Sequence, residues 1–209
     1  CFGGADAAHD SFTNLQKAIN YTMTSFLTTG GIRGSKKSAH HFEPRSFNMG
    51  LSKQAFEATQ GFSKIHPGED PDLSHRVKKE GFKTAFVPNI AVFHKRRVSW
   101  SSFILQVKKF GLVRPILNKW HPQGAKITFW FPTLFIFLTL ASIFLGIIYG
   151  WLFLLPLASY IAVIFADSSL KTKKMGIGFM AVFAMFIQFF GYGYGFLKAT
   201  IYIHWLEKD

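Results

Sequence analysis

Three carboxylates lie within four positions of the segment Gly68-Glu69-Asp70-Pro71-Asp72-Leu73. Like charges this close raise one another's pKa, and a cation, a metal ion or a proton relieves the repulsion, which is how a general base is often built. Because the segment precedes a predicted basic helix, the same residues can instead be ordinary partners of a helix dipole in a solvated turn. Glu69, Asp70 and Asp72 are therefore the first candidates for chemistry.

A second candidate site is the cationic run Lys95-Arg96-Arg97, which directly follows His94. Fixed cations stabilise the negative charge that develops on a leaving diphosphate. Since the run lies near the apolar half of the chain, it can instead contact anionic lipid headgroups. A Gly-rich basic loop over residues 28–37 also suits an anionic group, although a solvated surface loop fits it equally well.

The elements that must position these residues alternate between helix and strand. Polar clusters fall at the ends of these elements, where α/β folds bind their ligands. The sequence therefore predicts an α/β fold for the polar part of the chain. The expected helices cover 16–27, 53–59 and 73–79, and the expected strands cover 46–52, 84–88 and 91–94.

The chain divides near residue 126 into a polar part, 1–126, and an apolar part, 127–209. Lys and Arg outnumber Asp and Glu by 11 in the first part and by 2 in the second. Three apolar runs are typical of transmembrane helices, because about 20 apolar residues cross a hydrocarbon core of roughly 30 Å. They are 127–149, 151–166 and 175–197. A buried soluble core is the alternative, but a small domain cannot bury three such runs.

Positive charge predicts the orientation of these helices. The basic residues before the first run and the short loop at 171–174 should both face the cytoplasm. Two crossings satisfy this rule. A third crossing would place residues 198–209 outside, whereas the Gly-rich stretch 192–203 can also lie along the interface. Gly191, Gly193 and Gly195 are spaced to allow a close helix contact or a kink.

Cys1 is the single cysteine, so an internal disulfide and a cysteine-rich zinc site are both excluded. The polar part therefore fits a reducing compartment. The chain has neither an initiator Met nor a signal peptide at its start, and we expect it to be the C-terminal portion of a longer protein.

Several short motifs follow one another along the polar part: Asn48-Met49-Gly50, Gly61-Phe62, Gly68 to Leu73, Arg76, Gly81, His94 and a basic amphipathic helix. Their order resembles the acceptor-side half of a family 2 glycosyltransferase with a GT-A fold, and the resemblance covers roughly residues 40–120. Before residue 40 it is looser, but the Gly-rich loop and the helix that precedes it are similar to the segment between the two halves of bacterial membrane-bound members that build cell-surface polysaccharides. The resemblance implies a partial, Rossmann-like GT-A domain followed by an α-helical transmembrane region.

The resemblance implies roles for the candidate residues. Asp70 matches the catalytic base of the family, and Glu69 would orient it or hold its pKa. Asp72 would cap the following helix or pair with Arg76, with substrate binding as a second possibility. His94 falls where related enzymes bring a histidine near a divalent cation, Mg²⁺ or Mn²⁺, although a histidine bonded to a strand-end carbonyl fits equally well.

The remaining candidates would bind substrate. They are Asn48, Arg96, Arg97, Gln106, Lys109 and Phe110. The segment Gln106 to Phe110 resembles a degenerate Gln-x-x-Arg-Trp motif of processive members, with Lys109 in place of Arg and Phe110 in place of Trp. Lys and Phe cannot fully reproduce a diphosphate fork and a sugar-stacking indole, so the departure weakens a prediction of processive synthesis.

The resemblance predicts transfer of a sugar from a nucleotide-sugar donor to a glycan or lipid-linked acceptor. The expected setting is the cytoplasmic face of an inner membrane, with membrane lipid as a further partner and no nucleic acid. Apart from Asp70-Pro71-Asp72, whose roles are given above, no Asp-x-Asp-like motif for the nucleotide and its metal ion occurs in the sequence, since Gly4-Ala5-Asp6 has one carboxylate. We therefore expect the 209 residues alone to be inactive.

Two other classes remain open. A basic, membrane-anchored module that binds anionic lipid or another polyanion would explain the net charge of +13. It would not need Glu69, Asp70 and Asp72 within its basic half, since carboxylates repel phosphate. A small transporter would explain the helices, but their apolar runs hold no ionisable residue apart from the marginal Asp167.

Overall fold

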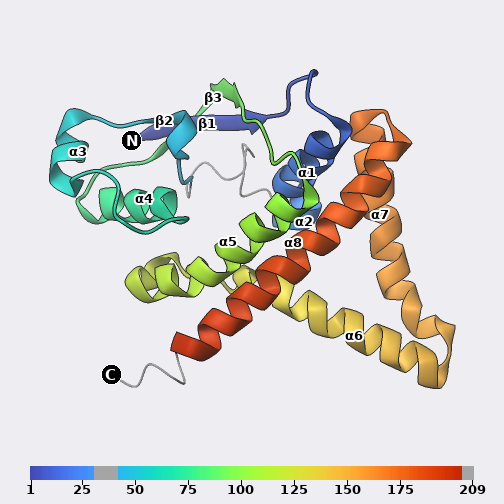
Figure 1. Ribbon diagram of the computed structural model, residues 1–209. Coiled ribbons are helices and arrows are strands. Elements are labelled where there is room, and N and C mark those ends of the chain that lie inside the picture. The colour runs from blue at the N-terminus through green and yellow to red at the C-terminus, as the bar shows by residue number, and fades with distance from the viewer. Residues whose placement is uncertain (31–41, 204–209) are drawn as a thin grey trace.

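The computed structural model describes residues 1–30 and 42–203 of the chain. Most of the predicted Gly-rich loop and the last residues of the chain lie outside this part. The sheet and the helices at 53–59 and 69–79 lie together at the upper left in Figure 1, and the long helices lie below them and extend to the right.

The sheet is small and mixed, with the order β2-β1-β3. β1 (Phe2–Ala7) pairs antiparallel with β2 (Met49–Gly50) and parallel with β3 (Ala85–Phe93). A Cβ at Gly3 or Gly4 would overlap the backbone of the segments beside it, so glycine permits the close pairing. The α/β prediction is thus confirmed as a mixed sheet with helices, whereas a Rossmann-like arrangement stays a prediction.

Two strand predictions need correction. Residues 46–52 do not form one strand, because Ser46–Asn48 is a 3-10 turn (η2) and β2 is only two residues long. The two strands expected at 84–88 and 91–94 are one continuous strand, β3. β1 was not predicted, since its two glycines and lone carboxylate do not have the pattern of a strand.

The helices of the polar part begin at side-chain caps or glycine turns. Thr13 and Gln16 form a capping box at the start of α1, and Ser52 and Ser99 cap α3 and α5. Ser25 divides the helix expected at 16–27 into two. The helices are α1 (Asn14–Thr24), α2 (Phe26–Thr29), α3 (Lys53–Thr59), α4 (Glu69–Lys79) and α5 (Trp100–Trp120).

Three helices of the apolar part are long and apolar enough to cross a membrane, as predicted. The second continues six residues beyond its predicted end. A 3-10 turn precedes each of the first two apolar helices. Another 3-10 turn, η3 (Pro122–Gly124), follows α5. The elements are η4 (Ile127–Trp130), α6 (Phe131–Tyr149), η5 (Trp151–Leu154), α7 (Leu155–Thr172) and α8 (Met175–Ile201).

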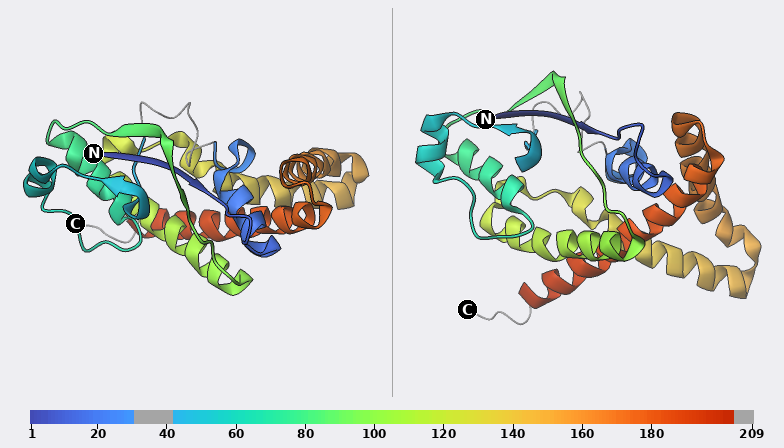
Figure 2. Two further views of the ribbon diagram at one scale, coloured as in Figure 1. Left: turned by 90° about the horizontal axis from the view of Figure 1, so that it is seen from above. Right: turned by 45° about the horizontal axis from the view of Figure 1, so that its top comes forward.

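α8 is the central helix of the structure. It contacts α1 and α5 of the polar part as well as α6 and α7, and both views in Figure 2 show it running along this group. A Cβ at Gly111 of α5 would overlap the α8 backbone, and one at Gly195 of α8 would overlap the α5 backbone. These glycines therefore make the close helix contact predicted from the spacing of Gly191, Gly193 and Gly195.

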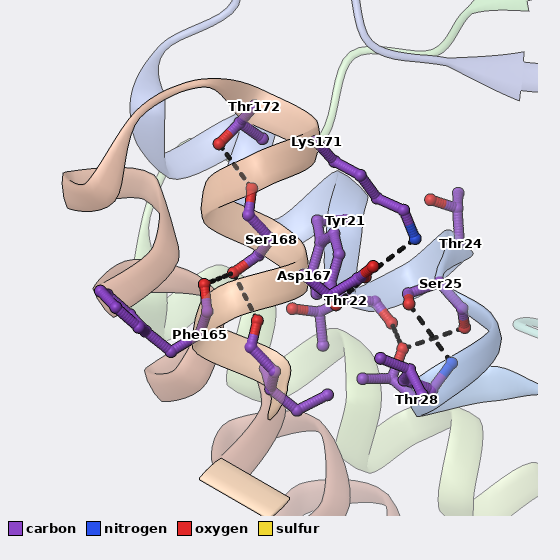
Figure 3. A network of polar contacts seen from close by, with 12 residues as sticks. Tyr21, Thr22, Thr24, Ser25, Thr28, Phe165, Asp167, Ser168, Lys171 and Thr172 are labelled. Carbon is purple, nitrogen blue, oxygen red and sulfur yellow. Dashed lines mark hydrogen bonds and ion pairs between the residues drawn. The ribbon is translucent and has the colours of Figure 1, made fainter. Parts of the chain in front are cut away.

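A polar contact joins α1 to the end of α7 (Figure 3). The Tyr21 hydroxyl donates to Asp167 Oδ2 at 2.6 Å, and Lys171 Nζ donates to the same oxygen at 2.8 Å. Burial, followed by the hydrogen bond to Asp167, raises the pKa of Tyr21 above its ordinary value, so this hydroxyl keeps its proton. The contact holds the basic end of α7 beside the polar part. A domain boundary at residue 126 stays a prediction.

Candidate active site

The parallel pairing of β1 and β3 brings two polar side chains to one edge of the sheet. Ala7 pairs with Phe93, so Asp6 and His94 both lie where these strands end. Arg96 Nη2 donates to Asp6 Oδ2 at 2.5 Å, and Arg96 Nη1 lies 2.9 Å from His94 Nδ1. The strand ends thus form a compact cluster of one carboxylate, one imidazole and one guanidinium.

Arg96 is held by α1 as well as by the strands. Its Nε donates to Asn20 Oδ1 at 3.0 Å, and its backbone carbonyl accepts from Gln16 Nε2 at 3.0 Å. Only 2% of the Arg96 side chain is exposed. The guanidinium therefore supports the site through protein contacts, and its predicted role in binding substrate stays a prediction.

A cavity of about 340 Å³ opens beside this cluster. Four of the predicted site residues line it, although three come from the segment that follows β3 and one, Gln106, comes from α5. Lys95 and Arg97 are exposed there, so the cavity presents two cations that can neutralise a diphosphate or another anion. The lining residues are His94, Lys95, Arg96, Arg97, Val98, Ser102 and Gln106.

Lys109 and Phe110 are not among the residues that line the cavity. Lys109 is exposed on α5. Phe110 packs against a buried apolar cluster that joins α1, α5 and α8, and this packing accounts for an apolar residue at its position. Their roles in substrate binding stay predictions.

Asp70 lies in the first turn of α4, where unpaired helical N–H groups create a positive potential. Gly68 precedes the helix with φ of 118°, a conformation that glycine adopts without strain. Asp70 Oδ1 accepts from the Ser46 N–H at 2.9 Å. The neighbouring Glu69 is directed elsewhere, since its Oε2 lies 3.2 Å from His66 Nδ1.

The turn η2 connects Asp70 with the cavity. Ser46 holds the Asp70 carboxylate, and the next residue, Phe47, stacks on His94 with ring centroids 3.9 Å apart. Asn48 Nδ2 donates to the Ala5 carbonyl at 3.3 Å, which fixes the turn to β1. Asn48 therefore supports η2 in this structure, and contact with substrate stays a prediction for it.

Asp72 forms an internal ion pair. Its side chain is 3% exposed, Arg76 donates to its Oδ2, and His121 Nε2 donates to its Oδ1 at 2.9 Å. Burial by itself raises the pKa of Asp72, but hydrogen bonds from Ser63, His121 and Arg76 outweigh burial and lower the pKa. The expected pairing with Arg76 is thus present, and the three clustered carboxylates face three different partners.

The described residues do not form a complete site for Mg²⁺ or Mn²⁺. Asp6 Oδ2 and His94 Nδ1 lie 3.8 Å apart, but the Arg96 guanidinium already serves as the cation between them. Across residues 1–30 and 42–203, no three His, Cys, Asp or Glu side chains gather as a metal site requires. A divalent cation near His94 stays a prediction.

Several residues of this region were not predicted from the sequence, among them Asp6, Glu43 and His121. The position of Asp6 in the site depends on the parallel pairing of β1 with β3. Glu43 and His121 contact α4 from segments that are distant in the chain. The clearest local sign of Asp6 as a site residue was its place near the end of an apolar segment, Gly4-Ala5-Asp6, because polar site residues often follow the carboxyl end of a strand.

A family model described as "Glycosyl transferase family group 2" matches residues 46–197, well over half of the chain. The chain belongs to this glycosyltransferase family. The family 2 resemblance drawn from the motifs is therefore confirmed. Comparisons with curated proteins and with solved structures gave no match.

The match to this glycosyltransferase family includes both halves of the candidate site. Asp70, η2, the cationic segment and α5 all fall within residues 46–197, as do most residues of the three apolar helices. Asp6 and α1, which hold Arg96 in place, precede the matched region. Membership of this family implies a sugar donor and an acceptor in general.

Proposed function

We propose that the protein transfers a sugar, with inversion, from a nucleotide-sugar donor to a glycan or lipid-linked acceptor. The observation that carries the proposal is the position of Asp70, whose carboxylate is fixed by the Ser46 N–H on a turn that also stacks on the cavity residue His94. A fixed carboxylate that this turn connects to a cationic cavity suits a base and a leaving diphosphate.

In the proposed reaction, Asp70 accepts the proton of an acceptor hydroxyl while its oxygen attacks the anomeric carbon of the donor. The bond between that carbon and the diphosphate oxygen breaks, and its electron pair leaves with the nucleoside diphosphate. Lys95 and Arg97, the exposed cations of the cavity, neutralise the leaving group. Gln106 contributes a polar contact at the same cavity.

The proposed setting is the cytoplasmic face of a bacterial inner membrane, in the synthesis of cell-surface polysaccharide. The bond between Tyr21 and Asp167 supports this orientation, because it holds the basic end of α7 beside the basic polar part. An active site close to membrane helices suits a lipid-borne acceptor. We expect the 209 residues alone to lack activity, since apart from Asp70-Pro71-Asp72 they hold no Asp-x-Asp-like motif for the nucleotide.

The test is sugar transfer in membranes that carry the full-length gene product, with a panel of radiolabelled nucleotide sugars and Mg²⁺ or Mn²⁺. Asp70→Asn should lower turnover by about 10²- to 10⁴-fold, the usual contribution of a general base. Glu80→Gln, an exposed carboxylate at the end of the same helix, is the matched control. Unchanged transfer by Asp70→Asn would exclude Asp70 as the base.

If no nucleotide sugar supports transfer, the result would favour the alternative function, a basic membrane-anchored module that binds anionic lipid. In that case, a basic membrane module should still bind vesicles that contain an anionic lipid such as phosphatidylglycerol. Asp70→Asn should not weaken that binding, because removal of a carboxylate lowers the repulsion of phosphate.

A further inference from the structure

Four buried side chains form a continuous row of contacts along α4. His121 Nε2 donates to Asp72 Oδ1 at 2.9 Å, the rings of His121 and His75 stack with centroids 4.9 Å apart, and His75 Nε2 lies 3.7 Å from Glu43 Oε1. None of the four side chains is more than 12% exposed. Polar groups are costly to bury unless they are paired, so this row calls for a role beyond filling space.

One end of the row belongs to the segment that leads into the first apolar helix. His121 is the capping residue directly after α5, and its N–H donates to the Leu117 carbonyl. The turn η3 follows directly, and Gly124 packs so closely on the His75 ring that a Cβ there would overlap it. The chain is therefore fixed against α4 a few residues before it enters α6.

The other end of the row leads to the candidate base. Glu43 faces His75, and three residues later the Ser46 N–H donates to Asp70 Oδ1. Burial by itself raises the pKa of Glu43, but the charges of Arg45, Arg114, His75 and Lys126 together outweigh burial and hold the pKa below its ordinary value. An ionised Glu43 thus fixes the start of the segment 43–46, and the last residue of this segment, Ser46, donates the hydrogen bond to Asp70.

We propose that His121 and Glu43 are positioning residues for Asp70, an inference that rests on the proposed transferase function. His121 fixes the first turn of α4 through Asp72, two residues from Asp70. Glu43 fixes the segment 43–46, which supplies the hydrogen bond to Asp70. The orientation of the base therefore depends on how the chain enters the membrane.

Misplacement of a catalytic group by about 1 Å can lower a rate by about 10²-fold, because bound reactants react only in a narrow range of geometries. Loss of either contact should therefore lower kcat while KM changes little. A residue with only a structural role would instead lower the amount of folded protein and leave the turnover of the folded molecules unchanged.

The experiment measures kcat and KM of the full-length protein with the donor that supports transfer. His121→Phe keeps a ring to stack on His75 but cannot donate to Asp72, whereas His121→Gln keeps a donor. We expect kcat to fall by about 10- to 100-fold in His121→Phe and to recover most of this loss in His121→Gln. His9→Phe, which replaces an exposed histidine before α1, should match the wild type.

Glu43→Gln provides a second test that keeps the size of the side chain. It should lower kcat with KM unchanged, and thermal unfolding in detergent should verify that the variants are folded. A wild-type kcat in both folded His121→Phe and Glu43→Gln would overturn this inference alone, provided that Asp70→Asn is inactive. Absence of transfer by the wild type would instead reject the proposed function.

Discussion

The rings of Phe47 and His94 are stacked, with centroids 3.9 Å apart and an interplanar angle of 28°. This contact joins the turn that holds Asp70 to the cationic cavity after β3. The two regions lie far apart in the sequence, and the stack fixes their relative position. A small change at Phe47 should therefore affect both parts of the site together.

Phe47→Ala should lower kcat of the full-length transferase by about 3- to 10-fold, because an aromatic pair contributes about 0.5–1.5 kcal/mol beyond its buried area. Phe56→Ala, at an exposed phenylalanine of α3, is the control and should have little effect. The measurement is the steady-state kcat of wild type, Phe47→Ala and Phe56→Ala under the same conditions. Equal rates for the two variants would contradict a role for the stack.

Arg97→Gln and Arg96→Gln should have different effects although the residues are neighbours. Arg97 is an exposed cation of the cavity, so its loss should raise KM for the nucleotide sugar by about 10-fold or more, as expected for one charge-assisted hydrogen bond. Arg96→Gln removes the buried cation beside Asp6 and should destabilise the fold by roughly 3 kcal/mol.

Kinetics and thermal unfolding of both arginine variants separate these outcomes. Arg97→Gln should keep the wild-type melting temperature. If Arg96→Gln unfolded like the wild type and only bound its donor more weakly, the buried guanidinium would be a substrate ligand. The interpretation of Arg96 as a residue that supports the site through protein contacts would then be wrong.

Gly195→Ala should loosen the contact between α5 and α8. A Cβ at Gly195 would overlap the carbonyl oxygen of Lys108, and overpacking of this kind costs about 1–3 kcal/mol. Gly176→Ala is the matched control, since nothing lies within 4 Å of a Cβ there and alanine favours a helix. The melting temperature in detergent should fall for Gly195→Ala and stay the same or rise for Gly176→Ala.

Asp72 should make the stability of the protein depend on pH in the acidic range. Its pKa is lower in the folded protein than in the unfolded chain, so its stabilising effect is fully present above the unfolded value of about 3.9 and is lost as pH falls through the folded value. The difference in melting temperature between wild type and Asp72→Asn should therefore shrink as the pH is lowered from 6 towards 3.

Glu57→Gln is a suitable comparison for this pH series, because Glu57 is an exposed carboxylate paired with Lys53 on the surface of α3. Its melting temperature should follow that of the wild type at every pH. A difference between wild type and Asp72→Asn that stays constant from pH 6 to 3 would show that ionisation of Asp72 does not stabilise the fold.

The apolar helices were predictable because their signal is local. A run of about 20 apolar residues reveals a possible crossing without any knowledge of its neighbours, and all three were found. α4 begins four residues before its predicted start at Leu73. Its first turn holds Glu69, Asp70, Pro71 and Asp72, and both proline and carboxylates suit a helix start, so the cluster is part of the helix.

The site was predictable only in part, because half of it depends on long-range contacts. His94, Arg96 and Arg97 are close in sequence, and their common cavity follows from a single segment. The partners of these residues do not follow from that segment, because Asp6 and Asn20 approach Arg96 from distant elements. Phe47 and His121 likewise carry no local pattern that reveals a stack on His94 or a bond to Asp72.

The position of α8 has a consequence for biosynthesis. α1 and α5 pack against a helix that leaves the ribosome after every other described element. Their apolar faces therefore stay uncovered while the sheet, α4 and the first two apolar helices are made. A nascent chain stopped before Met175 should lack the surface on which α1 and α5 assemble, so the candidate site is completed only after α8 has been made.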